Sequence, residues 1–318
     1  MFEIVRPGTQ IDFIGRWKLC ASLSLALILL SAVAIPLRGL RLGIDFAGGN
    51  EIQVRFADVE VEEGRIRTVV QGIGIEDASV VRFGGEEERE FLIRFRGGLD
   101  ETKANRLDPL RLSLTEQLGE LTILRVETVG PRVGGELRRD GLLALLMAFG
   151  AILVYVAFRF SARFSPGAVV AVVHDVLVTS GIWVLLGFEF DLRVLAALLA
   201  IIGYSLNDTI IVYDRIRENL EIHTGVDLPE VLNRSVNQTL SRTILTSGTT
   251  LVAVVSLWLV GGEVIRPFAI AMAIGIVVGT YSSIYIAAPT LLLLENRFGD
   301  AAGGGAQAQR PKPAKAKA

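Results

Sequence analysis

Long apolar runs are the feature of this 318-residue sequence that most limits what it can fold into. A transmembrane helix needs roughly 20 mostly apolar residues to cross about 30 Å of hydrocarbon. Runs of about that length occur at Leu19–Leu37, Gly141–Phe158, Ser165–Phe188, Leu192–Tyr213, Ile244–Gly262 and Pro267–Leu294. The sequence therefore predicts an α-helical membrane protein with six transmembrane helices.

Charged residues still make up 21% of the chain, so they must be concentrated in segments that lie in water. We divide the chain into four parts: an N-terminus with the first span (1–38), a folded domain (39–140), spans two to six (141–298) and a tail (299–318). The tail is rich in Gly, Ala, Gln, Pro and Lys without periodicity. This composition predicts disorder, and its lysines are candidates for contact with anionic lipid.

The orientation follows from the basic residues near the span ends, which mark the cytoplasmic side. That side carries Arg6, Arg16, Lys18, Arg159, Arg163, Arg215, Arg217, Arg234, Arg242 and Arg297, together with the basic tail. The short loops on the other side carry only Arg193 and Arg266. We expect both termini in the cytoplasm and the folded domain in the periplasm of a bacterial inner membrane. The first span is expected to be an uncleaved anchor, because its apolar run continues to Leu37.

The segment between the first two spans is predicted to be a ferredoxin-like α+β domain. Alternation and helical periodicity predict, in order, a strand, a helix, two strands, a helix and a strand at Glu51–Phe56, Glu62–Gln71, Ala78–Phe83, Glu90–Arg96, Glu101–Leu118 and Leu121–Thr128. The order βαββαβ is typical of a split βαβ sandwich. The domain contains neither His nor Cys. A binding or lever-like role therefore fits it better than catalysis.

Several classes of function are disfavoured by composition. The formal net charge is −2 and the basic residues are scattered except at the C-terminus, so we expect no nucleic-acid partner. The single cysteine, Cys20, lies in an apolar run, which leaves no disulfide framework or thiolate metal site. The sequence predicts neither a cofactor nor an enzyme.

Asp208 is the most informative polar residue, because a charge at mid-bilayer costs about 2.5–3.5 kcal/mol even on a lenient scale. Helical rise places it about 9 Å from the cytoplasmic end of the fourth span. Arg242 opens the fifth span and has a side chain long enough to reach that depth. We consider two interpretations open: a protonatable carboxylate stabilised by Arg242, or an arginine that extends to the headgroups beside an acid bonded to Ser or Asn.

Further polar residues lie in the third and fourth spans. His174 and Asp175 are neighbours near the middle of the third span, and adjacent helical residues point about 100° apart. We therefore expect them to face different partners, in a proton relay or in interhelical hydrogen bonds. Asn207, next to Asp208, is a candidate for orienting it, or for ordinary helix contact.

Small residues on the sixth span predict close helix packing. Ala271, Gly275 and Gly279 recur every four residues, which lets two helix backbones approach. The cluster Ser247–Thr250 in the fifth span is interpreted as a similar close-approach surface, or as the lining of a polar path.

Five motifs together resemble the SecF family of protein-export membrane subunits. They are Gly43–Gly49 (GIDFAGG), Val129–Gly134 (VGPRVG), His174-Asp175, Gly203–Asn219 (GYSLNDTIIVYDRIREN) and Ser241–Ser247 (SRTILTS). The first two contain the residues expected to form a structural motif, namely Asp45, Gly48, Gly49, Gly130 and Pro131. Ala47 stands where the family often has Thr. The resemblance extends from the N-terminus to Phe298.

This resemblance implies a partner of SecD in an accessory complex of the SecYEG translocon, within the resistance-nodulation-division superfamily. YajC is a further candidate partner, and the substrate would be a preprotein drawn into the periplasm with the proton motive force. In this family the aspartate of the Asn-Asp-Thr motif and the arginine of the Ser-Arg-Thr motif are implicated in proton passage. They match Asp208 and Arg242 here.

Three alternatives remain at this point. A proton-coupled exporter of lipids or drugs from the same superfamily would share the topology, but usually duplicates the six-span unit. A structural translocon subunit would not need Asp208. An intramembrane aspartyl protease would need Asp175 and Asp208 at one depth and a Gly-x-Gly-Asp motif, which the sequence lacks.

Overall fold

The computed structural model describes residues 10–57, 61–84, 88–95, 107–159 and 164–294. Within these ranges six helices are long and apolar enough to cross a membrane, as predicted. They are α1 (Trp17–Arg38), α5 (Pro131–Arg159), α6 (Ser165–Leu185), α7 (Leu192–Ile222), α8 (Leu228–Val260) and α9 (Arg266–Ser282). A π-helical turn, Ser283–Ala287, extends α9 into a last helical stretch. The predicted disordered tail, 299–318, lies outside the described residues.

Helices α7 and α8 are longer than the apolar runs that predicted them. α7 continues past Tyr213, and α8 begins at Leu228 rather than near Ile244. The added turns pack on each other through polar groups: the buried Asn219 amide donates hydrogen bonds to Ser235 Oγ at 2.8 Å and to Gln238 Oε1 at 2.7 Å. An apolar run marks only the part of a helix that suits lipid, so it does not predict where the helix ends.

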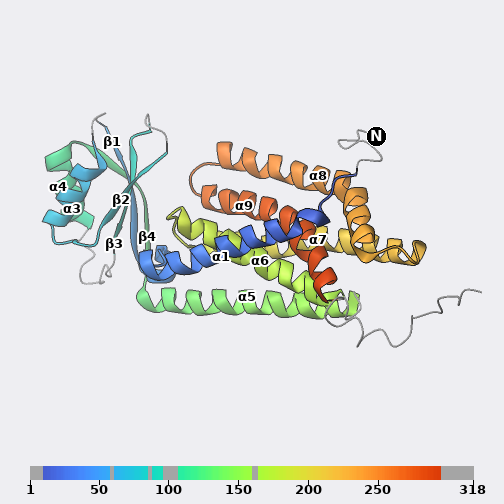
Figure 1. The fold of residues 1–318 in the computed structure, drawn as a ribbon. Coiled ribbons are helices and arrows are strands. Elements are labelled where there is room, and N and C mark those ends of the chain that lie inside the picture. Colours follow the sequence, from blue (N-terminus) through green and yellow to red (C-terminus); the bar gives the residue numbers. More distant parts are fainter. Residues whose placement is uncertain (1–9, 58–60, 85–87, 96–106, 160–163, 295–318) are drawn as a thin grey trace, which may run out of the picture.

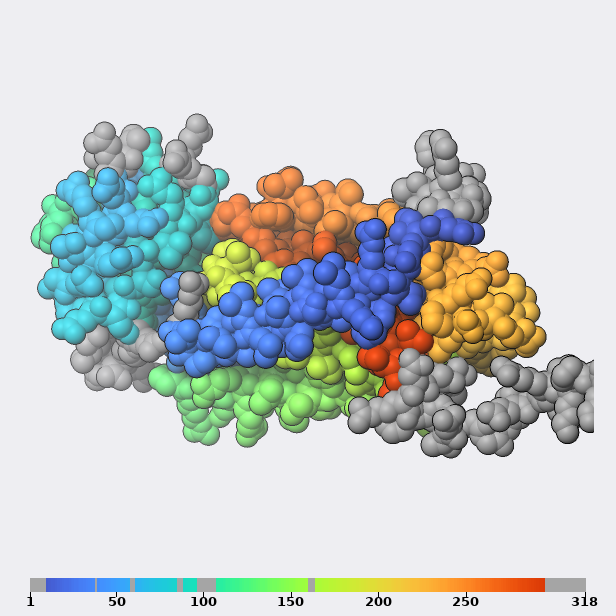
Figure 2. All heavy atoms as spheres, viewed as in Figure 1, coloured from blue at the N-terminus to red at the C-terminus, as the bar shows by residue number. Residues whose placement is uncertain are grey.

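Helices α6, α7 and α9 form the centre of the bundle. In their most apolar windows 56%, 50% and 56% of the residues are buried, against 17%, 11% and 17% for α1, α5 and α8. Figure 2 shows α1 lying across one face of the molecule. Its outward side chains include Leu19, Leu23, Leu25, Leu29 and Leu30. An apolar outer surface and an inner core that holds the polar residues are what a lipid environment requires.

The small-residue face of α9 packs against α7, as predicted. A Cβ added to Gly275 would collide with the Ile201 side chain, and one added to Gly279 would lie 3.1 Å from Ser205 Cβ. Ala271 is fully buried on the same face. The two backbones therefore approach closely at the level of the polar residues of the bundle.

The α+β domain lies at one end of the helices, opposite the first described residues (Figure 1). Its strands are β1 (Gly49–Phe56), β2 (Ser79–Phe83), β3 (Glu90–Phe95) and β4 (Leu121–Val129), in the antiparallel order β2-β3-β1-β4. Helices α3 (Glu63–Gly72) and α4 (Leu107–Leu118) cover one face. This confirms the predicted ferredoxin-like arrangement; residues 101–106 of the predicted second helix lie outside the described ranges.

Alternation along the strands separates two faces of the sheet. Ile52, Val54 and Phe56 of β1 are buried against α3 and α4, together with Phe91 and Ile93 of β3. Glu51 and Arg94 lie on the opposite face, which is directed toward the transmembrane helices. This second face forms the connection between the domain and the membrane part.

Candidate functional site in the transmembrane bundle

Asp208 lies on α7 with its side chain buried between α7, α8 and α9. Ser247 of α8 donates a hydrogen bond to Asp208 Oδ2 at 3.0 Å, and Thr280 of α9 lies 2.8 Å from the Ser247 hydroxyl. The other carboxyl oxygen, Oδ1, is buried and has no hydrogen-bond partner among the described residues. An ionised Asp208 would therefore need a further donor, because an unpaired buried charge is costly.

Arg242 does not form the direct pair with Asp208 that the sequence allowed. Its side chain lies on the exposed side of α8, and it has no hydrogen bond or ion pair to the rest of the described chain. Ser247, five residues later on α8, is the partner of the carboxyl instead. The guanidinium is better solvated outside the bundle. Its charge nevertheless acts favourably on an ionised Asp208.

His174 and Asp175 contact each other, which the sequence did not predict, although their partners on other helices differ. His174 Nδ1 lies 2.9 Å from Asp175 Oδ1, and both side chains are buried. Asp175 Oδ2 accepts hydrogen bonds from Ser205 of α7 and, at 2.8 Å, from Ser282 of α9. Adjacent helical residues point about 100° apart, but these two side chains are long enough to meet in the interior of the bundle.

Tyr281 attaches α1 to this cluster. Its ring stacks on the His174 imidazole with 6.2 Å between centroids, and its hydroxyl donates to the Cys20 carbonyl of α1 at 2.6 Å. His174 Nε2 is buried and without a partner in the described part of the chain. The cluster therefore joins α1, α6, α7 and α9 around one carboxylate.

Asn207 does not orient Asp208. Its side chain is exposed, and it forms no hydrogen bond within the described ranges. Consecutive helical residues point in different directions, so Asn207 faces outward where Asp208 faces inward. Ser205, one turn from Asp208, is the inward-facing polar neighbour, and it bonds Asp175.

The two buried acids occupy separate hydrogen-bonded groups. Asp208 is bonded through Ser247, whereas Asp175 is bonded through His174, Ser205 and Ser282. No hydrogen bond joins the two carboxyls in the described structure. A protease would need both acids on one water molecule, whereas the two carboxyls here have separate hydrogen-bond partners.

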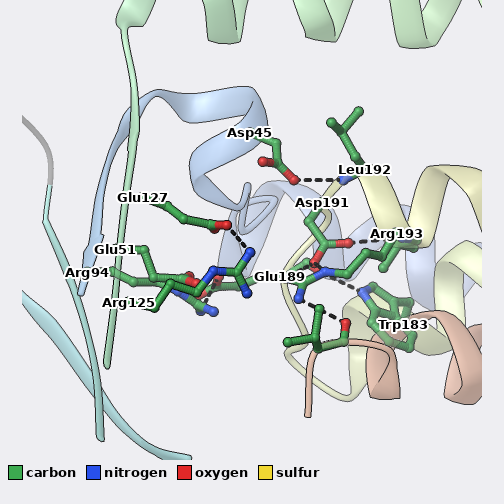
Figure 3. A network of polar contacts seen from close by, with 12 residues as sticks. Asp45, Glu51, Arg94, Arg125, Glu127, Trp183, Glu189, Asp191, Leu192 and Arg193 are labelled. Carbon is green, nitrogen blue, oxygen red and sulfur yellow. Dashed lines mark hydrogen bonds and ion pairs between the residues drawn. The ribbon is translucent and has the colours of Figure 1, made fainter. Parts of the chain in front are cut away.

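The five predicted motif residues come together where the domain meets the membrane helices. A short helix, α2 (Ile44–Ala47), precedes Gly48 and Gly49, whose φ angles are +72° and +139°. A Cβ on Gly48 would lie 2.9 Å from Pro131 Cα, the first residue of α5 after Gly130. Asp45 Oδ2 accepts a hydrogen bond from the Leu192 backbone N–H at 3.0 Å, at the start of α7 (Figure 3). The motif therefore attaches the domain to α5 and α7.

Arg94 makes a second connection to the membrane part. It bonds Glu51 on the neighbouring strand β1 and, at 2.5 Å, Glu189 in the loop between α6 and α7 (Figure 3). Burial disfavours the charged guanidinium, but the two carboxylates outweigh this effect and raise the pKa of Arg94 above its ordinary value. A cavity of about 250 Å³ lies beside these side chains.

Sequence reasoning missed several of these residues. Ser247 was identified as part of a close-approach surface or of the lining of a polar path, but not as a partner of Asp208. Thr280, Ser282 and Glu189 were given no role. The hydroxyl residues had a weak signal, because buried acids in lipid need donors from neighbouring helices. The sequence carries no signal for the Arg94–Glu189 contact, because this contact joins segments that are distant in sequence.

Two family models match the sequence. One, described as "Protein export membrane protein SecD/SecF, C-terminal", matches residues 111–297, and the "SecD/SecF GG Motif" matches residues 33–58. The "Protein translocase subunit SecF" of Desulfurispirillum indicum is 45% identical over 294 residues, covering 91% of this chain and 93% of that protein. This chain belongs to the SecF family.

Other relatives extend the comparison to a fused protein. The SecF-family chain is 41% identical over 295 residues to the "Protein translocase subunit SecF" of Vibrio alginolyticus, covering 92% of this chain and 93% of that one. It is 41% identical over 291 residues to the "Protein translocase subunit SecDF" of Thermus thermophilus, of which it covers 39%.

A crystal structure supports the fold. The crystal structure of the Thermus SecDF, described as a translocon-associated membrane protein, superposes with a TM-score of 0.82 at 39% identity, over 91% of this chain and 39% of that one. The SecF-family chain is thus a multi-pass membrane protein with an accessory role in Sec protein translocation.

Proposed function

We propose that this SecF-family chain, together with SecD, uses the proton motive force to promote late steps of preprotein translocation into the periplasm. The observation that carries the proposal is the placement of Asp208, an ionisable side chain buried among three transmembrane helices. One of its oxygens is bonded by Ser247, and the other is unpartnered among the described residues. Ionisable groups inside membrane helices are expensive and mark proton or ion pathways.

The energy available to such a site is sufficient for a switch. One proton crossing a potential of 100 mV gains about 2.3 kcal/mol. This changes a two-state population ratio by roughly fifty-fold, since each 1.4 kcal/mol is a factor of ten. Arg242 stabilises the ionised form through its charge, and protonation of Asp208 removes that attraction. His174, Asp175 and Asn207 remain candidate residues of the proton pathway.

Helix α7 provides a physical route from Asp208 to the domain. Asp208 lies about 24 Å along the helix axis from Leu192, at 1.5 Å per residue. The Leu192 N–H is bonded to Asp45, so a shift of α7 acts directly on the segment that enters β1. The bond from Arg94 to Glu189 adds a contact to the loop that precedes α7. The domain would respond as a lever while it contacts the preprotein.

We place the protein in a bacterial inner membrane with both termini in the cytoplasm and the α+β domain in the periplasm. SecD is the expected partner, because the Thermus relative carries the name SecDF and this chain covers 39% of it. The SecYEG translocon, YajC and surrounding membrane lipid are further proposed contacts.

The decisive experiment is translocation of a preprotein into vesicles that contain this chain and its SecD. We expect Asp208→Asn and Arg242→Met to assemble normally but to lose the stimulation by a proton gradient. Glu221→Gln and Arg217→Met are matched controls, because these residues form an exposed ion pair on the same helix as Asp208. Both controls should retain the stimulation.

A structural role for the subunit makes the opposite prediction. If Asp208→Asn and Arg242→Met vesicles respond to the gradient as the wild type does, the chain does not couple protons to transport, and Asp208 has only a packing role.

A further inference from the structure

The Asp208 carboxyl on α7, the Ser247 hydroxyl on α8 and the Thr280 hydroxyl on α9 form a hydrogen-bonded series. Ser247 Oγ lies 3.0 Å from Asp208 Oδ2 and 2.8 Å from Thr280 Oγ1. Thr280 Oγ1 also lies 2.8 Å from the Ile276 carbonyl oxygen of its own helix. Ser247 and Thr280 each have one hydroxyl hydrogen, so neither can donate to both of its neighbours at once. The protonation state of Asp208 decides which neighbour receives it.

With Asp208 ionised, the carboxylate can only accept. Ser247 must then donate to Asp208, and Thr280 can donate to the Ser247 oxygen. With Asp208 protonated on Oδ2, the acid donates to Ser247, Ser247 donates to Thr280, and Thr280 donates to the Ile276 carbonyl. Both arrangements give every hydroxyl hydrogen an acceptor. The change adds one proton to Asp208, and the two hydroxyl groups only rotate.

We infer that Ser247 and Thr280 are positioning residues that reverse their hydrogen-bond direction when Asp208 takes up a proton, and so transmit its protonation state to α9. The inference rests on the proposed function, because it requires that Asp208 titrates. Networks of this kind are cooperative, since each bond depends on the direction of the next. Asp208 and α9 are thereby coupled without a direct contact between the acid and the α9 backbone.

The hydrogen-bonded series ends at Thr280, and this position favours α9 as the responding helix. Thr280 lies three residues before the π-helical turn Ser283–Ala287. Such π-helical turns are rare and frequently lie at functional sites inside α-helices. Extra donation to a helix carbonyl from a threonine hydroxyl also bends helices slightly. When the hydrogen-bond directions reverse, the donation from Thr280 Oγ1 to the Ile276 carbonyl is gained or lost.

Other titratable groups lie on α7 itself and on the helices that pack around it. They are Arg242 on α8, His174 and Asp175 on α6, Tyr204 and Tyr213 on α7, and Tyr281 on α9. Asp175 and His174 bond to each other and to Ser205 and Ser282, and Tyr213 donates to the Ala287 carbonyl. In the described structure none of these side chains hydrogen-bonds Ser247 or Thr280.

The test uses the full chain in complex with its SecD, in nanodiscs, and follows carboxyl infrared bands during acidification. The band that disappears in Asp208→Asn belongs to Asp208. Thr280→Val keeps the shape of the side chain but removes the acceptor for Ser247 in the protonated arrangement. In Thr280→Val we expect the band of protonated Asp208 to appear only at a lower pH than in the wild type, and at a different frequency. Thr280→Ser should restore the wild-type band.

Thr290→Val is the matched control. Thr290 lies after the same π-helical turn and bonds the Ile286 carbonyl in the same way, at 2.6 Å, with no carboxyl nearby in its hydrogen bonding. The Asp208 band should be unchanged in this variant. If Thr280→Val, Thr280→Ser and Thr290→Val all match the wild type while Asp208 still titrates, the inference is wrong and the proposed function stands. If no band depends on Asp208 and Asp208→Asn vesicles respond to the gradient, both fail.

Discussion

Asp175 and Asp208 are both buried acids, but their hydrogen bonding differs. Asp175 is bonded on both oxygens, by His174, Ser205 and Ser282, whereas Asp208 is bonded on one. A fully bonded buried carboxylate stabilises the helices that supply its donors. A partly bonded one is poised to change its partner when it binds a proton.

Replacement of Asp175 should therefore reduce stability. Asp175→Ala removes the partner of the Ser205 hydroxyl and of the His174 imidazole, whereas Ser282 keeps the Gly279 carbonyl as an acceptor. Buried unpaired groups cost about 1–3 kcal/mol each. We expect a fall in the free energy of unfolding of about 3 kcal/mol, measured by denaturation in detergent micelles. Asp214→Ala, which removes an exposed ion pair with Arg159, should have little effect. Equal loss in both variants would contradict the structural role of Asp175.

The sequence predicted which acids matter but not their partners. A carboxylate in an apolar run is conspicuous because its burial is costly, so Asp208 was predictable. Its partner depended on helix rotation, which decides whether Arg242 or Ser247 faces the acid. Residue spacing on a single helix does not determine that rotation.

At the scale of elements, two glycines of α9 allow close packing of this helix against α7. Gly275 packs on Ile201 and Gly279 on Ser205, so the α7–α9 interface has little room for larger side chains at these positions. Gly48 plays the same part between the entrance to β1 and the start of α5, where its positive φ adds a conformational requirement.

Enlarging these glycines should destabilise the protein. Gly275→Ala places a methyl group against Ile201, and overpacking of this kind costs about 1–3 kcal/mol. The free energy of unfolding should fall by that amount. Gly248→Ala on α8 is the control, because nothing lies within 4 Å of the added Cβ. Helix propensity predicts that it is neutral or stabilising by up to about 1 kcal/mol. A larger loss at Gly248 than at Gly275 would contradict the packing described.

Sequence patterns predicted the element types better than their ends. Alternation identified all four strands of the domain, because one face of each lies on α3 and α4. The extensions of α7 and α8 beyond the apolar runs were not predicted, because polar residues such as Asn219 and Gln238 interrupt the apolar pattern there. These turns pack through buried Ile216, Leu232 and Val236, beside the hydrogen bonds of Asn219.

At the scale of the whole molecule, the domain has two kinds of attachment to the helices. One is the covalent and glycine-packed entrance at Gly48. The other is the Arg94–Glu189 ion pair, which joins β3 to the loop before α7. Because its two carboxylate partners raise the pKa of Arg94, the contribution of the charged guanidinium is lost as the pH rises through that elevated value. Arg94 therefore remains charged at neutral pH, so deprotonation of this arginine does not detach the domain there.

Weakening the ion pair should loosen the domain without affecting proton binding. Glu189→Gln removes one of the two carboxylates on Arg94, and a hydrogen bond between charged groups is worth about 1.5–3 kcal/mol. We expect faster hydrogen exchange in β3 and in the loop before α7. Glu218→Gln, which affects an ion pair with Arg215 in the part of α7 beyond Tyr213, should leave exchange in β3 unchanged. Unaltered exchange in Glu189→Gln would show that the contact does not hold the domain.

The most direct test of proton coupling is a distance measurement between the domain and the membrane part. After Cys20→Ser, spin labels at Glu116 on α4 and Gly262 between α8 and α9 report the distance in the complex with SecD. We predict that the populations of distances change when the pH is lowered in the wild type and do not change in Asp208→Asn. An identical response in both proteins, or none in either, would contradict the claim that protonation of Asp208 moves the domain.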